Sequence, residues 1–255
     1  MKDGAHDLEA RANYEAWRAK PLLRRVYRDM FEDLARELTS LAGPTVEIGS
    51  GIGNIREVVP DCIRTDMFPA PWLDRTENAY ELSFASDSVA NLILFDVFHH
   101  LRYPGTALRE LERVLAPGGR LLIFEPCMSL LGRVIFGLFH PEPIALRDTI
   151  TWLAPDGWNC RIPEYYAAQG NASRIFGSTA RGRHIEGLEL LAVKRFARLS
   201  YVASGGYSKR QLYPDRAYPV IRQLDRVLDL MPAVFATRLL VVLQKPVRDA
   251  VTAPN

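Results

Sequence analysis

Val46-Glu47-Ile48-Gly49-Ser50-Gly51-Ile52-Gly53-Asn54 is the stretch of this sequence that decides the fold. The lead-in from Thr45 to Ile48 predicts a buried parallel strand. The glycines at alternate positions predict a tight turn in which a ligand can lie against the backbone, and residues 55–59 predict the start of a helix. Free backbone N–H groups would then lie at the carboxyl end of the strand, so the pattern indicates a nucleotide-type site.

Glu47 indicates which kind of nucleotide this turn would bind. A dinucleotide fingerprint has its third glycine one position later, where this chain has Asn54. A carboxylate two residues before the first glycine would repel a pyrophosphate and attract a cation, such as the amino group of a methionine moiety. The structural alternative is a glycine-rich turn beside an acid that is satisfied within the protein.

The composition is that of one large α/β domain, or of one domain with a small cap. The chain has 255 residues, of which 48% are hydrophobic and 24% charged, and its net charge is +2. We expect no nucleic-acid partner, because the basic clusters are short and are typical of solvated faces. The alternative is that they contact an anionic substrate or lipid headgroups. These clusters are Arg24-Arg25 with Arg28, Arg181-Gly182-Arg183-His184, and Lys194-Arg195 with Arg198.

The three cysteines, Cys62, Cys127 and Cys160, indicate a reducing compartment. They are odd in number, far apart and without metal-ligand spacing, so we expect neither disulfides nor a metal site. The polar residues 1–11 do not resemble a signal peptide, and the apolar segment 128–139 is too short to span a bilayer. The sequence therefore predicts a cytoplasmic protein with at most peripheral membrane contact.

Strand and helix patterns alternate along much of the chain. We expect strands over residues 45–48, 62–65, 89–95, 120–125 and 237–244, an edge strand near 72–74 or 79–81, one or two strands within 188–203, and helices within 12–41, over 104–115 and over 218–230. This alternation favours a parallel sheet with right-handed crossovers. The predicted fold is therefore α/β, a Rossmann-like, doubly wound and mostly parallel seven-stranded sheet, with N-terminal helices and a helical or irregular cover.

Further motifs follow the glycine-rich turn in a fixed order. Asp66 ends the second strand, where an acid can accept hydrogen bonds from both ribose hydroxyls. The later motifs are Asn78-Ala79, Leu82-Ser83-Phe84, the turn around Asp87, His99-His100-Leu101 and Arg113-Val114-Leu115-Ala116-Pro117-Gly118-Gly119. Together they resemble the class I S-adenosylmethionine-dependent methyltransferases of the type 11 group, among them the quinone C-methyltransferases. The resemblance covers residues 43–126.

This resemblance implies S-adenosylmethionine as the cofactor and implies a set of binding residues. The family's methionine and ribose contacts fall on the glycine-rich turn and Asp66, and its adenine contacts on Met67 and the residues that follow. Where the family usually has an acid, Asn78 keeps an acceptor oxygen but loses the charge. The implied cofactor-binding residues are Glu47, Gly49, Ser50, Gly51, Asp66, Met67, Asn78, Ala79 and Phe95.

The resemblance also divides the chain into four regions. Residues 1–42 would form an N-terminal helical cap and residues 43–126 the cofactor-binding core. Residues 127–187, rich in Pro and Gly and without a clean period, would form a cover over the acceptor. Residues 188–255 would complete the sheet.

Three side chains are candidate catalytic bases. Methyl transfer from a sulfonium is an in-line displacement that depends mainly on alignment, and it needs a base only when the acceptor holds a proton of high pKa. His99 and His100 follow the fourth predicted strand and Glu125 ends the fifth, at the same rim. The alternatives are that the histidines only pack or cap the next turn and that Glu125 only accepts hydrogen bonds.

His140-Pro141-Glu142-Pro143 follows the apolar segment 128–139, which we interpret as a core-packing helix rather than a membrane anchor. The two prolines stiffen this short stretch. It would either form the roof of an acceptor pocket, with His140 or Glu142 facing the substrate, or simply stop the helix.

The sequence thus favours methyl transfer to a small molecule or to a lipid- or sugar-linked metabolite, at O, N or C. One alternative is a module that binds S-adenosylmethionine without catalysis. The other is a nicotinamide-dependent oxidoreductase, which the glycine spacing and Glu47 oppose.

Overall fold

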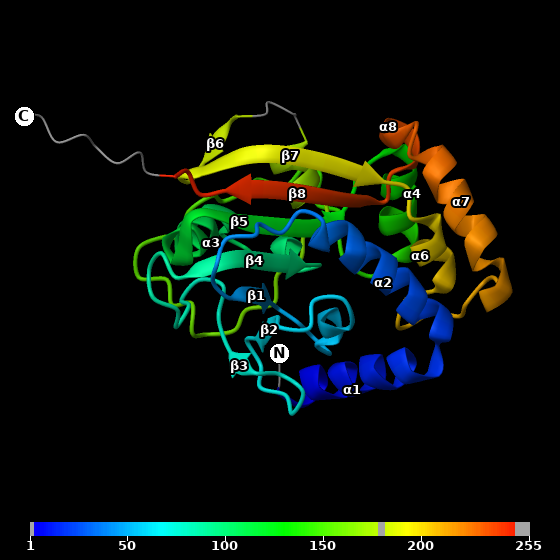
Figure 1. The fold of residues 1–255 in the computed structure, drawn as a ribbon, viewed down its shortest axis with the longest axis horizontal. Coiled ribbons are helices and arrows are strands. Elements are labelled where there is room, and N and C mark those ends of the chain that lie inside the picture. Colours follow the sequence, from blue (N-terminus) through cyan, green and yellow to red (C-terminus); the bar gives the residue numbers. More distant parts are fainter. Residues whose placement is uncertain (1–2, 178–181, 248–255) are drawn as a thin grey trace, which may run out of the picture.

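The structure is a computed structural model that describes residues 3–177 and 182–247 (Figure 1). Residues 1–2, 178–181 and 248–255 lie outside the described residues. They include the start of the predicted cap, four residues of the predicted cover with Arg181, and the end of the predicted C-terminal region.

A sheet of eight strands forms the centre of the described chain, in the order β3-β2-β1-β4-β5-β8-β7-β6 (Figure 1). The strands are β1 (Thr45–Ile48), β2 (Ile63–Asp66), β3 (Arg75–Thr76), β4 (Val89–Phe95), β5 (Leu115–Pro126), β6 (His184–Ile185), β7 (Leu188–Phe196) and β8 (Arg238–Gln244). The first five strands in this order, β3, β2, β1, β4 and β5, pair in parallel. Strand β8 pairs antiparallel with β5, β7 with β8, and β6 with β7. The predicted mostly parallel fold is confirmed, with one strand more than the predicted seven.

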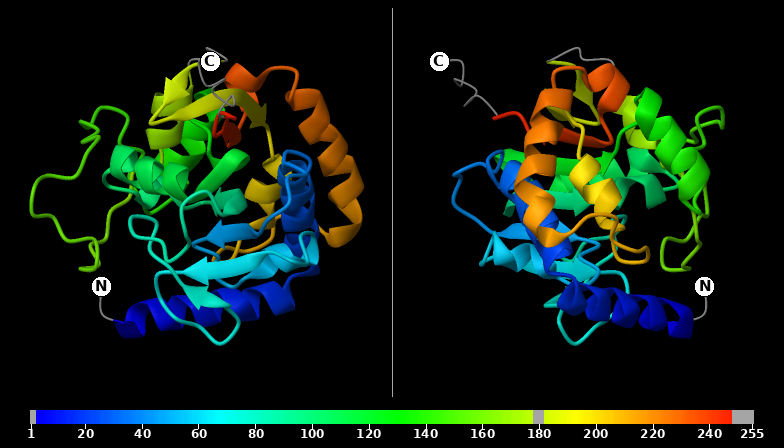
Figure 2. Two further views of the ribbon diagram at one scale, coloured as in Figure 1. Left: turned by 60° about the vertical axis from the view of Figure 1, so that its left-hand side comes forward. Right: turned by 90° about the vertical axis from the view of Figure 1, so that its right-hand side faces the viewer.

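Helices cover both faces of the sheet (Figures 1 and 2). They are α1 (Asp3–Ala19), α2 (Pro21–Ala35), α3 (Pro104–Val114), α4 (Leu130–Phe139), α5 (Asn171–Phe176), α6 (Leu199–Ser204), α7 (Tyr218–Leu228) and α8 (Pro232–Phe235), with short 3₁₀ helices η1 (Asn54–Glu57), η2 (Phe98–His100) and η3 (Asp215–Ala217). Helix α2 contributes to the apolar cluster on one face, and α3 and α5 to the cluster on the other. The sheet is therefore doubly wound.

Local sequence explains the elements that the prediction placed correctly. All residues of β4 except Asn91 are apolar, and all seven are buried. Helix α2 begins with Pro21 in its first turn and buries Leu22, Val26, Met30 and Leu34, which lie at helical spacing. Helix α7 and the irregular segment after α4 lie on opposite sides of the sheet (Figure 2).

Four expectations were wrong in detail. The helix expected over 55–59 is only η1, because Pro60 follows it closely. Strand β3 lies at 75–76, between the two expected positions, after the proline-rich segment 69–71. Strand β5 begins at Leu115 rather than at residue 120, with an irregularity in its register with β4. Helix α1 begins at Asp3, before the region 12–41 in which the N-terminal helices were expected, whereas β7 does lie within the expected strand region 188–203.

Helix α4 contradicts our interpretation of residues 128–139 as a core-packing helix. Gly132 and Phe136 are buried, but Leu130, Leu138 and Phe139 are 63%, 74% and 62% exposed. A Cβ on Gly132 would lie 1.9 Å from the Cys127 carbonyl oxygen, so this small residue lets α4 approach the chain on one narrow face. Among residues 3–177 and 182–247, no helix has both the length and the apolar composition that crossing a membrane requires.

Candidate active site

The loops that carry most of the predicted site residues lie at the edge of the sheet where the parallel strands β1, β2, β4 and β5 end. Adjacent parallel strands finish at the same edge, so the loops that follow them are neighbours there. The glycine-rich turn follows β1, a proline-rich loop follows β2, and η2 follows β4. This edge is therefore the candidate active site.

The glycine-rich turn is held against β2 by hydrogen bonds of Ser50 and Gly51. The Ser50 backbone N–H donates to the Thr65 carbonyl oxygen at 2.7 Å, and the Gly51 N–H donates to Asp66 Oδ2 at 3.1 Å. Gly49 and Gly51 have φ angles of 74° and 53°. These left-handed conformations favour glycine, and they bring the backbone of the turn directly to the edge of the sheet.

Gly49→Ala is expected to lower the free energy of unfolding by about 2–3 kcal/mol, because its Cβ would lie 2.4 Å from Val97 Cγ2 in a left-handed conformation. Gly51→Ala is the matched control, since nothing lies within 4 Å of a Cβ there, and it should cost only about 1 kcal/mol. Urea unfolding of both variants measures the difference. Equal losses would contradict the close approach of Gly49 to Val97, and adding Val97→Ala should restore part of the loss in Gly49→Ala.

Glu47 lies beneath this turn with its carboxylate buried. The residue is 2% exposed, and its Oε2 has no hydrogen-bond partner among the described residues. Burial, assisted by the charge of Asp66, raises the pKa of Glu47 to about 7, against the weaker opposing effects of Ser50 and Arg64. A buried carboxylate oxygen without a partner is costly, so this side chain is suited to receive a cationic ligand group.

Asp66 faces a cavity of about 280 Å³ that Gly51, Phe68 and Trp72 also line. The Trp72 indole N–H donates to the Gly51 carbonyl oxygen at 2.8 Å, and the Tyr14 ring of α1 stacks on Trp72 with centroids 5.2 Å apart. Sequence reasoning missed the contribution of both aromatic side chains to this wall. The tryptophan directly after Pro69-Ala70-Pro71 was the available signal.

The residues implied around the adenine are divided between a second cavity and the core. Met67 and Asn78 line a cavity of about 420 Å³ together with Cys160 of the cover. The Asn78 side-chain amide donates to the Cys160 carbonyl oxygen at 2.8 Å and its Oδ1 accepts from the Tyr80 N–H at 3.0 Å. Ala79 is buried in the apolar cluster on the α3 face of the sheet. These contacts leave the role of Asn78 and Ala79 in cofactor binding a prediction.

Phe95 packs within the core rather than facing a cavity. Its ring stacks on Phe124 with centroids 4.8 Å apart and lies 5.0 Å from Phe31 of α2. The side chain therefore supports the end of β4. Any contact with the cofactor would have to come through its backbone, and this assignment also stays a prediction.

His99 and Glu125 form a buried pair. The imidazole Nδ1 donates to Glu125 Oε2 at 2.6 Å, and the Phe98 backbone N–H donates to Glu125 Oε1 at 2.6 Å. Burial lowers the pKa of His99, but Glu125 and Glu142 raise it more, to about 10. A protonated His99 accepts no proton near neutral pH, and Glu125 is fully buried, so this geometry disfavours both as general bases.

His100 retains a free nitrogen at the rim. Its Nδ1 lies 2.9 Å from the Tyr166 carbonyl oxygen, which can only accept, so Nδ1 carries a hydrogen. In the neutral ring, Nε2 is then the unprotonated nitrogen. The His100 side chain is 38% exposed, which makes it the most accessible of the three predicted bases.

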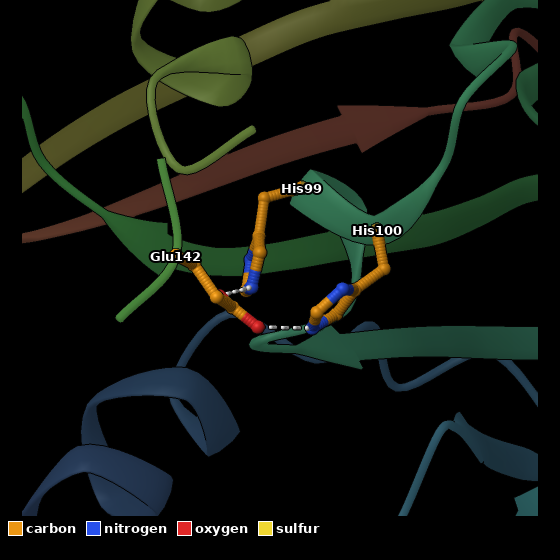
Figure 3. A group of neighbouring side chains, drawn as sticks. All are labelled: His99, His100 and Glu142. Atoms are coloured by element: carbon orange, nitrogen blue, oxygen red, sulfur yellow. Dashed lines mark ion pairs between the residues drawn. The ribbon is translucent and has the colours of Figure 1, made fainter. Parts of the chain in front are cut away.

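Glu142 reaches both histidines from the cover (Figure 3). Its Oε2 lies 3.4 Å from His99 Nε2, and its Oε1 lies 3.8 Å from His100 Nε2. Burial raises the pKa of Glu142, but the two histidines and Tyr165 lower it to about 2. Helix α4 ends at Phe139, directly before residues 140–143, which confirms the helix stop, whereas the role of this stretch as the roof of an acceptor pocket stays a prediction.

Asp96 is paired with an arginine from the far end of the sequence. It has a φ of 56°, and its carboxylate accepts two hydrogen bonds from the Arg238 guanidinium, one of them at 2.8 Å. Arg238 begins β8, is 1% exposed and lies 4.4 Å from the centre of the Tyr201 ring. No sequence pattern signalled this pair, because it depends on β8 lying beside β5.

The family model described as a methyltransferase domain matches residues 46–123, which include the glycine-rich turn, Asp66 and the two histidines. The chain contains a methyltransferase domain over these residues. The chain is 32% identical over 71 residues to part of the Dictyostelium discoideum protein named "Probable polyketide synthase 10". That match covers 26% of this chain and 3% of the length of the relative.

Solved methyltransferases share the fold of the domain and of the parts around it. A S-adenosylmethionine-dependent methyltransferase from Archaeoglobus fulgidus is similar with a TM-score of 0.51 and 13% identity, covering 87% of this chain and 94% of the other. One from Thermotoga maritima is similar with a TM-score of 0.50 and 15% identity, and the match covers 91% of this chain and 94% of the other. The methyltransferase fold thus extends well beyond residues 46–123.

Proposed function

We propose that this protein transfers a methyl group from S-adenosylmethionine to a small-molecule acceptor. The observation that carries the proposal is the buried Glu47 carboxylate, which has an unpartnered oxygen beneath the glycine-rich turn. The positively charged amino group of the methionine moiety would satisfy it. A pyrophosphate would be repelled at the same place.

The neighbouring groups are suited to the rest of the cofactor. Each Asp66 carboxylate oxygen accepts one backbone N–H, from Gly51 or from Phe68, which leaves lone pairs for two ribose hydroxyls. The cavity beside Asp66 and Trp72 would hold the nucleoside. The protein would then act mainly by aligning the sulfonium with the acceptor and excluding water, with His100 as the base where the acceptor needs one.

We propose that residues 43–126 bind the cofactor and that the cover, residues 127–187, holds the acceptor. Contacts of the cover with η2 support this: the Ala168 N–H donates to the His99 carbonyl oxygen at 3.0 Å, and Tyr166 accepts from His100. The acceptor would be a small molecule or a lipid- or sugar-linked metabolite. A cytoplasmic location is supported by Cys62, Cys127 and Cys160, which are all free thiols.

Calorimetric titration of the purified protein is expected to show binding of S-adenosylhomocysteine at one site and no binding of NAD. The reason is that the Glu47 carboxylate attracts an amino group and repels a pyrophosphate. Each ligand is titrated separately at the same protein concentration, so that the two binding heats can be compared directly. Binding of NAD without S-adenosylhomocysteine would overturn the proposal in favour of a nicotinamide-dependent enzyme.

A further inference from the structure

We propose that His99, His100 and Glu142 bind a divalent transition-metal ion (Figure 3). One ligand atom from each residue lies within 4.8 Å of the other two. The carboxylate oxygens of Glu142 are 3.4 Å from His99 Nε2 and 3.8 Å from His100 Nε2. Ligands bound about 2.0–2.2 Å from one ion lie about 3–3.5 Å apart, so only small side-chain shifts are needed to close the site.

Outer hydrogen bonds already orient both imidazole rings for a metal. His99 donates its Nδ1–H to the Glu125 carboxylate, and His100 donates its Nδ1–H to the Tyr166 carbonyl oxygen. Histidine ligands in metal sites are held in this way, by a carboxylate or a backbone carbonyl on the nitrogen that does not bind the ion. Both Nε2 atoms consequently turn toward Glu142. His99 and Glu125 are buried, and binding of the ion would displace the Nε2 proton that His99 carries in the free protein.

The donor set selects the kind of ion. Two imidazoles and one carboxylate suit first-row transition metals such as Zn²⁺, Fe²⁺ or Ni²⁺, whereas Mg²⁺ and Ca²⁺ prefer oxygen ligands. A second grouping, Asp96 with His99 and Glu125, is less suitable, because Asp96 is paired with Arg238 and Glu125 accepts the Phe98 N–H. The spacing of the cysteines predicted no metal site, but it carries no information about histidines that the fold brings together.

Three protein ligands leave positions on the ion open for a substrate. Ligation would occupy the His100 nitrogen that could act as a base, so a bound ion would take over the role of lowering the pKa of an acceptor proton. The histidines belong to η2 at the edge of the sheet and Glu142 belongs to the cover, so the ion would join the two parts between which we place the acceptor. If the proposed methyl transfer holds, the acceptor class would be a molecule that chelates the ion through two neighbouring oxygen atoms. This last step rests on the proposed function, whereas metal binding itself does not.

The test is titration of the chelator-stripped protein with Co²⁺ and Zn²⁺, followed by calorimetry and by the visible absorption of bound Co²⁺. One equivalent of each ion is expected to bind, and Mg²⁺ is not expected to compete. His100→Ala and Glu142→Gln should each weaken binding by about 100-fold or more, since loss of a mere outer partner already costs 10–100-fold. His184→Ala, which removes an exposed histidine on β6, is the matched control and should bind as the unmodified protein does.

Failure to bind one equivalent of either ion, or equal affinity in His100→Ala and the His184→Ala control, would overturn the metal site. Thermal melts of each variant show whether it is folded before its titration is interpreted. His100 is partly exposed, so its removal should leave the fold intact. The metal titration contains neither S-adenosylmethionine nor S-adenosylhomocysteine. Failure of the metal site is therefore distinguishable from failure of the proposed cofactor binding.

Discussion

Glu47→Gln is expected to weaken the binding of S-adenosylhomocysteine by about tenfold or more at mildly alkaline pH. The substitution keeps the shape of the side chain but removes its charge, and a hydrogen bond to a charged group contributes about 1.5–3 kcal/mol. Calorimetry of both proteins measures the change in Kd. Unchanged affinity in the folded variant would show that the buried carboxylate does not hold the ligand.

The pH dependence of binding gives a second readout of the same carboxylate. The pKa of Glu47 in the free protein is raised to about 7 by burial, so the side chain is increasingly protonated as the pH falls below that value. Ligand binding needs the ionised form, and affinity should therefore fall by up to about tenfold per pH unit below about 7. In Glu47→Gln this dependence should disappear. A pH-independent Kd in the unmodified protein would contradict the assignment.

The stability of Glu47→Gln serves as the folding control. The folded protein holds the Glu47 proton up to a pH of about 7, whereas an unfolded glutamic acid releases it near its ordinary pKa of 4.5. The free energy of unfolding is thus lowered as the pH rises through this window. At pH 8 the glutamine variant should be more stable than the unmodified protein, by up to about 3 kcal/mol. Weaker binding then cannot result from unfolding.

Asp96→Asn is expected to lower the free energy of unfolding by about 3–5 kcal/mol. Arg238 is 1% exposed, and Asp96 is the carboxylate that its guanidinium contacts in the described structure. Removing one partner of a buried ion pair leaves an uncompensated charge in the core. Urea unfolding measures the loss, and Glu164→Gln is the control, because Glu164 and its partner Arg102 are both 49% exposed and a surface pair of this kind should contribute less than about 1 kcal/mol.

A double variant distinguishes charge from packing in this pair. Arg238→Met removes the buried charge and keeps apolar volume between Phe95 and Tyr201. In that background Asp96→Asn should cost much less than it does alone. Equal costs in the two backgrounds would mean that Asp96 stabilises the fold through its backbone conformation rather than through Arg238.

The parts of the fold that could be predicted depend on patterns within short segments. The apolar run of β4, the spacing of Leu22, Val26 and Met30 in α2, and the glycine-rich turn each specify their own conformation. Glu47 and Asp66 could be placed together because neighbouring parallel strands end at one edge. For this reason the cofactor side of the site follows from the sequence.

The acceptor side could not be predicted, because it depends on the path of an irregular segment. Nothing near His99 in the sequence indicates that Glu142 would return to it, and a backbone carbonyl such as that of Tyr166 leaves no sequence signal. The exposure of α4 was missed for a related reason. Its apolar residues are typical of a core helix, but α4 contacts the rest of the protein only along the narrow face that contains Gly132.

The contact between Asp96 and Arg238 also bears on the order in which the protein can mature. Asp96 leaves the ribosome long before Arg238, which begins the last strand of the described chain. Until β8 is synthesised, β5 has a bare edge and Asp96 lacks its guanidinium. Contacts so distant in sequence form late. The glycine-rich turn can therefore assemble early during translation, while the rim beside it is completed only after β8 has been synthesised.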